Sequence, residues 1–239
     1  MKKLFLSLFT LITVVAVAQE KTVVADANAE KRTLSGSFTA ITISDGIDLI
    51  LTQGNEESVA VSASEQKYME RFKTVVENGT LKIYFDNSAV NWAINEKRKL
   101  RAYVSFKVLE RLNASGGANI KLQGSAKVDD LHMKFTSGTV FEGKLTAKDL
   151  TVEQNSGSSI NIAGSADKIN VEVSSGAFFK GYDLAVNFCD AKASSGGGVR
   201  ITINKELTAK ANSGGGVRYK GDAVIKEIDV SSGGSVKKA

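Results

Sequence analysis

Apolar and polar residues alternate in short runs through most of the chain, and many of these runs end at a Ser-Gly pair. Before such a pair, the third, fifth and seventh residues upstream of the glycine are mostly apolar, as in Leu131, Met133 and Phe135. Downstream, the third and fifth residues are again apolar, as in Ile160 and Ile162. Successive side chains of a strand point to opposite faces, so the pattern predicts strands with one buried face on either side of each pair.

The Ser-Gly pairs recur at a nearly constant interval of 18 to 22 residues. They stand at Ser115-Gly116, Ser137-Gly138, Ser156-Gly157, Ser175-Gly176, Ser195-Gly196, Ser213-Gly214 and Ser232-Gly233. The first copy fits the apolar pattern when it is shifted by one residue to Gly117. A unit of about 19 residues cannot bury its own apolar face, but stacked units form a continuous core. The sequence therefore predicts an all-β fold, a right-handed parallel β-solenoid (β-helix) with rungs of about 19 residues.

The glycines of these pairs are best explained as sharp corners of the coil. The stretches Ser194–Ile201 and Asn212–Tyr219 are glycine clusters that resemble phosphate-binding loops, but each leads into a strand rather than a helix. The nine-residue glycine-aspartate repeat of calcium-binding rolls is also missing. We therefore expect a positive φ at each corner, which glycine adopts at little cost.

The chain before the regular repeats is less periodic. We expect longer, irregular rungs over residues 33–108, with one or two helical turns between Glu65 and Lys73 that place Tyr68, Met69 and Phe72 toward the core. Asn78-Gly79 predicts a tight turn. The predicted organisation is a signal peptide over 1–18, a lead segment over 19–32, and one solenoid domain over 33–239, with Ser-Gly rungs over 109–236.

Several segments resemble a known bacterial family. The stretches Phe38–Gly54 (FTAITISDGIDLILTQG) and Leu81–Asn87 (LKIYFDN), together with the serial Ser-Gly corners, are similar to the autotransporter adhesin head domains of the GIN type. The Gly-Ile-Asn element of that family stands here as Gly46-Ile47-Asp48. The resemblance implies an exported β-solenoid of adhesin-like character, and its motifs are structural rather than catalytic.

The first eighteen residues predict export. Met1-Lys2-Lys3 provides a basic start, Leu4–Val17 is an apolar run, and Ala16-Val17-Ala18 is a small-residue cleavage site. A buried N-terminal helix is the alternative interpretation. No cysteine follows the apolar run, so we expect a protein of the periplasm, cell surface or extracellular space that is not a lipoprotein. Without residues 1–18, 29 basic residues face 26 acidic ones, a charge of +3 that does not favour nucleic-acid binding.

No set of residues in the sequence predicts a catalytic, cofactor or metal site. His132 is the only histidine and falls on an outward position, and the only cysteine, Cys189, falls on an inward one. Asp129-Asp130 is expected in a turn between repeats. Trp92 could stack on a sugar ring or plug the coil. A polysaccharide-active enzyme remains the alternative to a non-catalytic binding or scaffolding module, which the sequence favours.

One outward row of side chains is a candidate ligand-binding surface. Four residues after the corner glycine, three successive rungs carry Lys180, Arg200 and Arg218, and two positions further on lie Tyr182 and Lys220. The row before the corner mixes charges of both signs. A row of cations is usually a solvated surface with counter-ions. The sharper hypothesis is a docking strip for an acidic glycan or a phosphorylated envelope polymer; a protein partner is also open.

Overall fold

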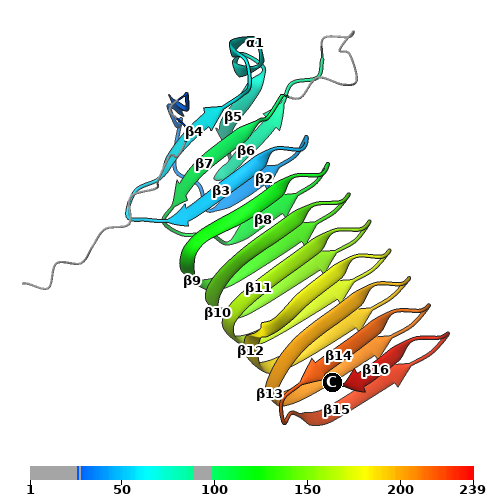
Figure 1. Cartoon of the computed structure of the whole chain (residues 1–239). Helices are drawn as coiled ribbons and strands as arrows, with labels where there is room; N and C mark the ends of the chain where they lie inside the picture. Colours follow the sequence, from blue (N-terminus) through cyan, green and yellow to red (C-terminus); the bar gives the residue numbers. More distant parts are fainter. Residues whose placement is uncertain (1–25, 27, 89–97) are drawn as a thin grey trace, which may run out of the picture.

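The computed structural model describes residues 26, 28–88 and 98–239, and these form the predicted parallel β-solenoid of about seven turns (Figure 1). The N-terminal part contains β1 (Glu30–Arg32), β2 (Ala40–Ile43), β3 (Asp48–Gln53), β4 (Ser58–Ser62), α1 (Gln66–Met69), β5 (Phe72–Glu77), β6 (Thr80–Phe85) and β7 (Arg101–Phe106). The repeats contain β8 (Arg111–Ala114), β9 (Asn119–Phe135), β10 (Val140–Gln154), β11 (Ser159–Val173), β12 (Phe178–Ala193), β13 (Gly198–Ala211), β14 (Gly216–Lys220), β15 (Val224–Val230) and β16 (Ser235–Lys238).

Each rung is a flattened loop with two different edges. At one edge a tight Ser-Gly turn separates consecutive strands. At the other edge the long strands β9 to β13 bend without ending, and three of the four pairs among them shift register at this bend (Figure 1). Near Gly124 and Gly164 the chain therefore turns through a wide bend inside a strand. The strand after each tight turn belongs to one face of the coil, and the strand before it to the other.

The tight turns form a ladder along the coil. In the turn of Ser137 and Gly138, φ is 56° and 70°, and the Thr139 N–H donates to the Thr136 carbonyl at 3.4 Å. Positive φ at both central residues defines a type I′ turn. The glycine N–H also donates to the carbonyl of the first central turn residue in the next rung, as from Gly138 to Ser156 at 3.0 Å. The expected positive φ at the corner glycines is confirmed, and the serines share it.

The ladder begins before the Ser-Gly repeats. Positive φ falls on Asp45 and Gly46, and next on Gly116 and Gly117 rather than on Ser115. The shift of the first copy to Gly117 is therefore confirmed. The Gly46 N–H donates to the Gly116 carbonyl at 2.8 Å, which joins these two turns although 70 residues of chain separate them.

The order of the first rungs differs from their order along the chain. β3 lies between β7 and β9, and β2 lies between β6 and β8. The rung of β2 and β3 therefore comes first in the sequence but second in space, and the later strands β6 and β7 form the outer rung. The antiparallel strands β4 and β5 pair with that outer rung, and β1, which falls in the expected lead segment, pairs with β4. These elements and α1 close this end of the coil.

The interior is one continuous hydrophobic core that runs from Phe38 to Val217. The helical turn places Tyr68 and Met69 in this core, as the sequence predicts; Phe72 is also buried there, but it begins β5 and does not belong to the helical turn. Cys189 is buried in the inward row between Ile169 and Leu207. Burial raises the pKa of its thiol far above the ordinary value, and the neighbouring Asp190 adds to the shift, so the thiol behaves as a small apolar group.

Candidate ligand-binding surface

Basic residues occupy matching positions on four successive strands of one face. In the register of the parallel ladder, Lys180 of β12 lies beside Arg200 of β13, which lies beside Arg218 of β14 and then Lys237 of β16. Neighbouring strands are about 4.8 Å apart, so four cationic side chains follow one another along the coil axis at that interval. We call these four residues, together with Phe178, Tyr182 and Lys220, the basic strip.

An aromatic ring flanks the row on the side of the tight turns. Phe178 begins β12, and the guanidinium carbon of Arg200 lies 5.0 Å from the centre of its ring. The neighbouring position on β13 is Gly198, where an added Cβ would lie only 2.6 Å from the Phe178 ring. Glycine at this position leaves the space in which the ring lies over the next strand beside the arginine.

A second ring lies on the bend side of the row because its rung carries one extra residue. The rung that starts at Ser175 is 20 residues long, and the register between β11 and β12 shifts between Asn161 and Ala163. Tyr182 is the additional residue, a bulge that redirects one side chain. Its carbonyl accepts a hydrogen bond from Thr202 Oγ1 at 2.7 Å, and the Lys220 ammonium lies 4.4 Å from the centre of its ring.

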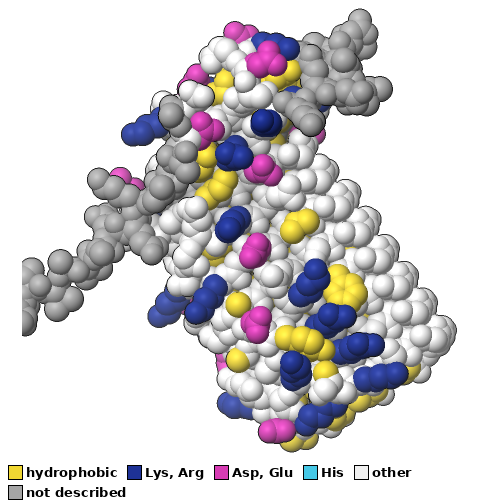
Figure 2. Space-filling view, viewed as in Figure 1, with side chains coloured by type: hydrophobic (Ala, Val, Ile, Leu, Met, Phe, Trp, Pro, Cys, Tyr) yellow, Lys and Arg dark blue, Asp and Glu magenta, His cyan; other side chains and the backbone are white. Residues whose placement is uncertain are grey.

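The basic strip is not neutralised by acidic side chains of the described chain. None of its cations takes part in an ion pair among residues 28–88 and 98–239, although Lys238 next to it pairs with Asp222 at 3.3 Å. Asp183 lies at the margin, at the bend. Figure 2 shows dark blue side chains with yellow ones among them over the β12 to β16 end of this face, whereas blue and magenta mix over the middle of the coil.

The corresponding row on the opposite face has a different charge pattern. Its residues carry charges of both signs, in the order Lys134, Glu153, Glu172, Lys192, Lys210 and Asp229. Lys134 pairs with Glu153 at 3.0 Å, and His132 lies 3.1 Å from the same carboxylate. The hydrogen bond from Lys134 lowers the pKa of Glu153. This row neutralises itself, as the sequence predicts, and the basic strip does not.

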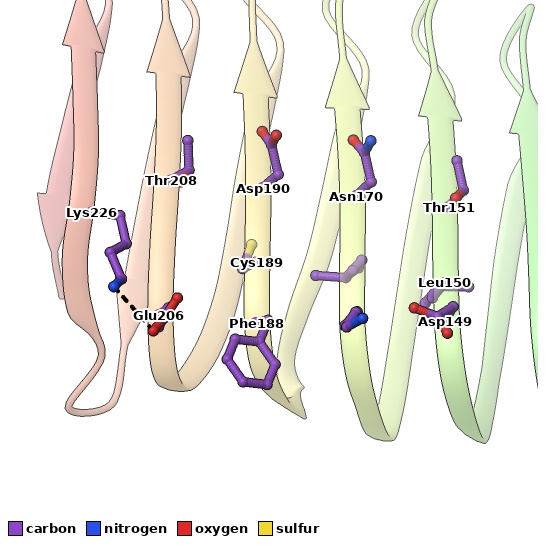
Figure 3. A pocket seen from close by; sticks show the side chains of 12 residues that line it. Asp149, Leu150, Thr151, Asn170, Phe188, Cys189, Asp190, Glu206, Thr208 and Lys226 are labelled. Atoms are coloured by element: carbon purple, nitrogen blue, oxygen red, sulfur yellow. Dashed lines mark ion pairs between the residues drawn. The ribbon is translucent and has the colours of Figure 1, made fainter.

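The same opposite face carries a hollow of about 350 Å³ that is one candidate for a catalytic site (Figure 3). Three carboxylates line it, Asp149, Asp190 and Glu206, and each comes from a different strand. Glu206 pairs with Lys226 at 3.2 Å. Figure 3 shows the Asp190 and Glu206 carboxylates at different heights along neighbouring strands, with Glu206 turned to Lys226.

Other residues that the sequence singled out lie apart from the basic strip. The expectation of a turn at Asp129-Asp130 is wrong, because both residues lie within β9, where the wide bend keeps the strand paired. His132 is half exposed on the opposite face, beside Glu153. Among the described residues, no three His, Cys, Asp or Glu side chains are grouped as metal ligands. Trp92 and the predicted signal peptide lie outside the described residues.

Sequence reasoning missed Phe178 and Lys237. Lys237 lies four residues after Gly233, so the offset that identifies Arg200 and Arg218 also identifies it. For Phe178 the signal is fainter: on the next two strands, glycines 198 and 216 occupy the matching position, which leaves room for a ring. The sequence correctly placed Lys180, Arg200 and Arg218 in one row. It did not predict the bulge that sets Tyr182 under Lys220.

Comparisons with solved structures agree with this fold. A putative adhesin from Bacteroides fragilis superposes with a TM-score of 0.79 at 15% identity, over 88% of this chain and 96% of that one. A putative lipid binding protein from Parabacteroides distasonis has a TM-score of 0.61 at 20% identity, over 90% and 98% of the two chains. A putative adhesin from Parabacteroides merdae also has a TM-score of 0.61, at 16% identity, over 90% and 97%. At these identities the similarity shows the fold alone.

Sequence comparison identifies the family. No protein with a curated function matches the chain. In the described part of the molecule, no helix has the length and apolar character needed to cross a bilayer. The family model described as "Putative auto-transporter adhesin, head GIN domain" matches residues 37–223, which include the Asp45-Gly46 turn, six of the seven Ser-Gly pairs and most of the basic strip. The chain therefore belongs to the family of adhesin head domains of the GIN type.

Proposed function

We propose that this protein is an exported, non-catalytic adhesin-like module that binds an acidic polysaccharide along the basic strip. The family supports the adhesin-like character. The observation that carries the ligand class is the row of Lys180, Arg200, Arg218 and Lys237 in register on successive strands, without an acidic partner in the described chain. Like charges on neighbouring strands repel one another, and a bound polyanion would relieve that repulsion.

The chemistry of the strip suits a sugar chain that carries carboxylates or sulfates. The two guanidinium groups can each donate two parallel hydrogen bonds to such a group. Phe178 and Tyr182 lie on either side of the row with Arg200 and Lys220 over their rings, so these two cations lie beside apolar surface that suits the sugar rings between the anionic groups. The anionic groups of a polysaccharide repeat along its axis, and the cations repeat along the coil, so the two axes would run parallel.

A salt-dependent binding assay with a charge-reversal variant tests this proposal. The chain without residues 1–18 is expected to bind an immobilised uronic-acid polysaccharide at low salt and to lose binding as salt is raised, because exposed charges are screened. The double variant R200E/R218E should lose at least about tenfold in affinity, the result of losing two charge-assisted contacts. Its melting temperature should match that of wild type.

The chain offers a matched control on the opposite face. K168E/K192E makes the same change of charge on two neighbouring strands, β11 and β12, at lysines that, like Arg200 and Arg218, have no ion pair in the described chain. If this control loses as much affinity as R200E/R218E, binding depends on net charge and not on the strip. Vesicles that contain anionic lipid form a second arm, because one structural neighbour is described as a putative lipid binding protein. Binding to vesicles alone would contradict the polysaccharide proposal.

A further inference from the structure

The last coil exposes aliphatic side chains that earlier coils bury. β15 follows the inward row of the coil with Ile225, Ile228 and Val230, which are 38%, 44% and 46% exposed. Their neighbours on β13 in the same row are Leu207, Ala209 and Ala211, and these are at most 1% exposed. Figure 2 shows yellow side chains along the lower border of the molecule, where Figure 1 places β15.

β15 also has an unpaired edge. Among the described strands it pairs only with β13, so the N–H and C=O groups on its other side are free. At the opposite end of the coil, β4 and β5 pair with the edges of β7 and β6. Solenoids usually end in a cap with a polar outer face, and an open hydrophobic edge strand promotes association. The match to the family model stops at residue 223, one residue before β15 begins.

We propose that two copies of this chain associate end to end through β15, which pairs antiparallel with β15 of the second copy about a two-fold axis. The sequence of β15 is complementary to itself in one register. When the axis passes between Lys226 and Glu227, each Lys226 lies opposite Glu227 of the other copy, and each Ile225 lies opposite Ile228. If the axis were centred on Glu227 instead, the Glu227 side chains of the two copies would lie opposite each other, and their like charges would repel.

The side-chain directions agree with the first register. Ile225 and Ile228 pair with the inward residues Leu207 and Ala209, because a register shift at Lys226 keeps both isoleucines on the core side. Opposite residues of an antiparallel pair lie on the same face of the sheet, so the isoleucines of the two copies would meet over the core. Lys226 and Glu227 lie on the outer face and already make ion pairs within the chain, with Glu206 at 3.2 Å and Lys210 at 3.4 Å.

Measuring the molecular mass over a range of concentrations, by sedimentation velocity of the chain without residues 1–18, tests this proposal. Wild type is expected to show a reversible dimer. K226E and E227K should each weaken dimerisation about tenfold or more, because each places like charges opposite one another at both contacts. An equimolar mixture of the two variants should dimerise again, because each contact then pairs a glutamate of one variant with a lysine of the other.

The mixture shows why the single variants dimerise weakly: through repulsion between the copies in the proposed register, or through loss of an internal ion pair or of the fold. A variant that only lost its internal ion pair, or only perturbed the fold, would not be rescued by its counterpart. The control K148E makes the same charge change at an exposed residue of β10 in the middle of the coil and should leave the dimer intact. A wild-type chain that is monomeric at every concentration, single variants that dimerise normally, or a mixture that stays monomeric would each overturn the proposal.

Discussion

The two edges of each rung both carry the chain from one face of the coil to the other, one through a tight turn and the other through a wide bend. The tight turns keep one register throughout, and every irregularity between neighbouring repeat strands lies at or toward the wide bend. Counted between equivalent turn glycines, from Gly117 onward, the interval varies from 18 to 21 residues, and the bend absorbs this variation. The turn edge is therefore the part of the coil that specifies stacking, and the bend edge is the part where the surface can change, as the Tyr182 bulge illustrates.

The largest effect is expected at the wide bend. An added Cβ at Gly164 would lie 2.0 Å from the carbonyl oxygen of Leu145 in the preceding rung, and φ at Gly164 is +114°. Gly164→Ala must therefore move the backbone of one rung away from the other, at a cost of about 3 kcal/mol or more in the free energy of unfolding. Chemical denaturation measures this loss. Gly36→Ala, at an open position with ordinary φ, is the control, and equal stability of both variants would contradict the close approach.

A smaller loss is expected at a tight turn. Gly176 has a φ of +69°, and an added Cβ would meet no atom within 4 Å. Gly176→Val therefore carries only the cost of placing a β-branched residue at positive φ, about 1–3 kcal/mol. Thermal melting followed by circular dichroism measures it, with Gly36→Val as the control. A loss greater than that of Gly164→Ala would reverse the ranking of the two edges.

The smallest effect is a gain in stability. Serines occupy the first central position of six tight turns with φ of 48–56°, a conformation that costs an ordinary L-residue about 1–2 kcal/mol. Asparagine tolerates this conformation better and is favoured in type I′ turns. Ser175→Asn is therefore expected to raise the free energy of unfolding by up to about 1 kcal/mol. Denaturation midpoints that fall instead would mean that the serine hydroxyl stabilises the turn more than its backbone conformation destabilises it.

The repeated part of the fold could be predicted because each rung encodes its own period. Alternation around Ser-Gly identified the inward row, including Cys189, and the outward row that contains Arg200 and Arg218. The order of the first rungs could not be predicted in the same way. β3 alternates as β7 does, and the local pattern does not say which of them pairs with β9. That choice depends on contacts between segments 70 residues apart, such as the hydrogen bond from Gly46 to Gly116.

In the candidate site, too, one part could be predicted from the sequence and another could not. The cations of the row follow from a fixed offset, so the sequence predicts them, and it also contains Lys237 at that offset. The positions of the two rings depend on a side chain that is absent from the neighbouring rung and on a residue that is inserted in their own rung. Phe178 lies over a missing side chain at Gly198, and Tyr182 arises from one inserted residue. Such relations between rungs emerge only when the strands are placed side by side.

The backbone hydrogen bonds between rungs run along the axis of the coil, and this direction determines how the molecule responds to tension. A force that separates its two ends loads each rung-to-rung ladder one bond row after another, rather than shearing a whole strand at once. The coil should therefore lengthen stepwise from an end. Each rung of about 19 residues that peels away adds roughly 60 Å of extended chain. A head domain held between a cell and a surface would thus yield gradually under load while the remaining rungs stay folded.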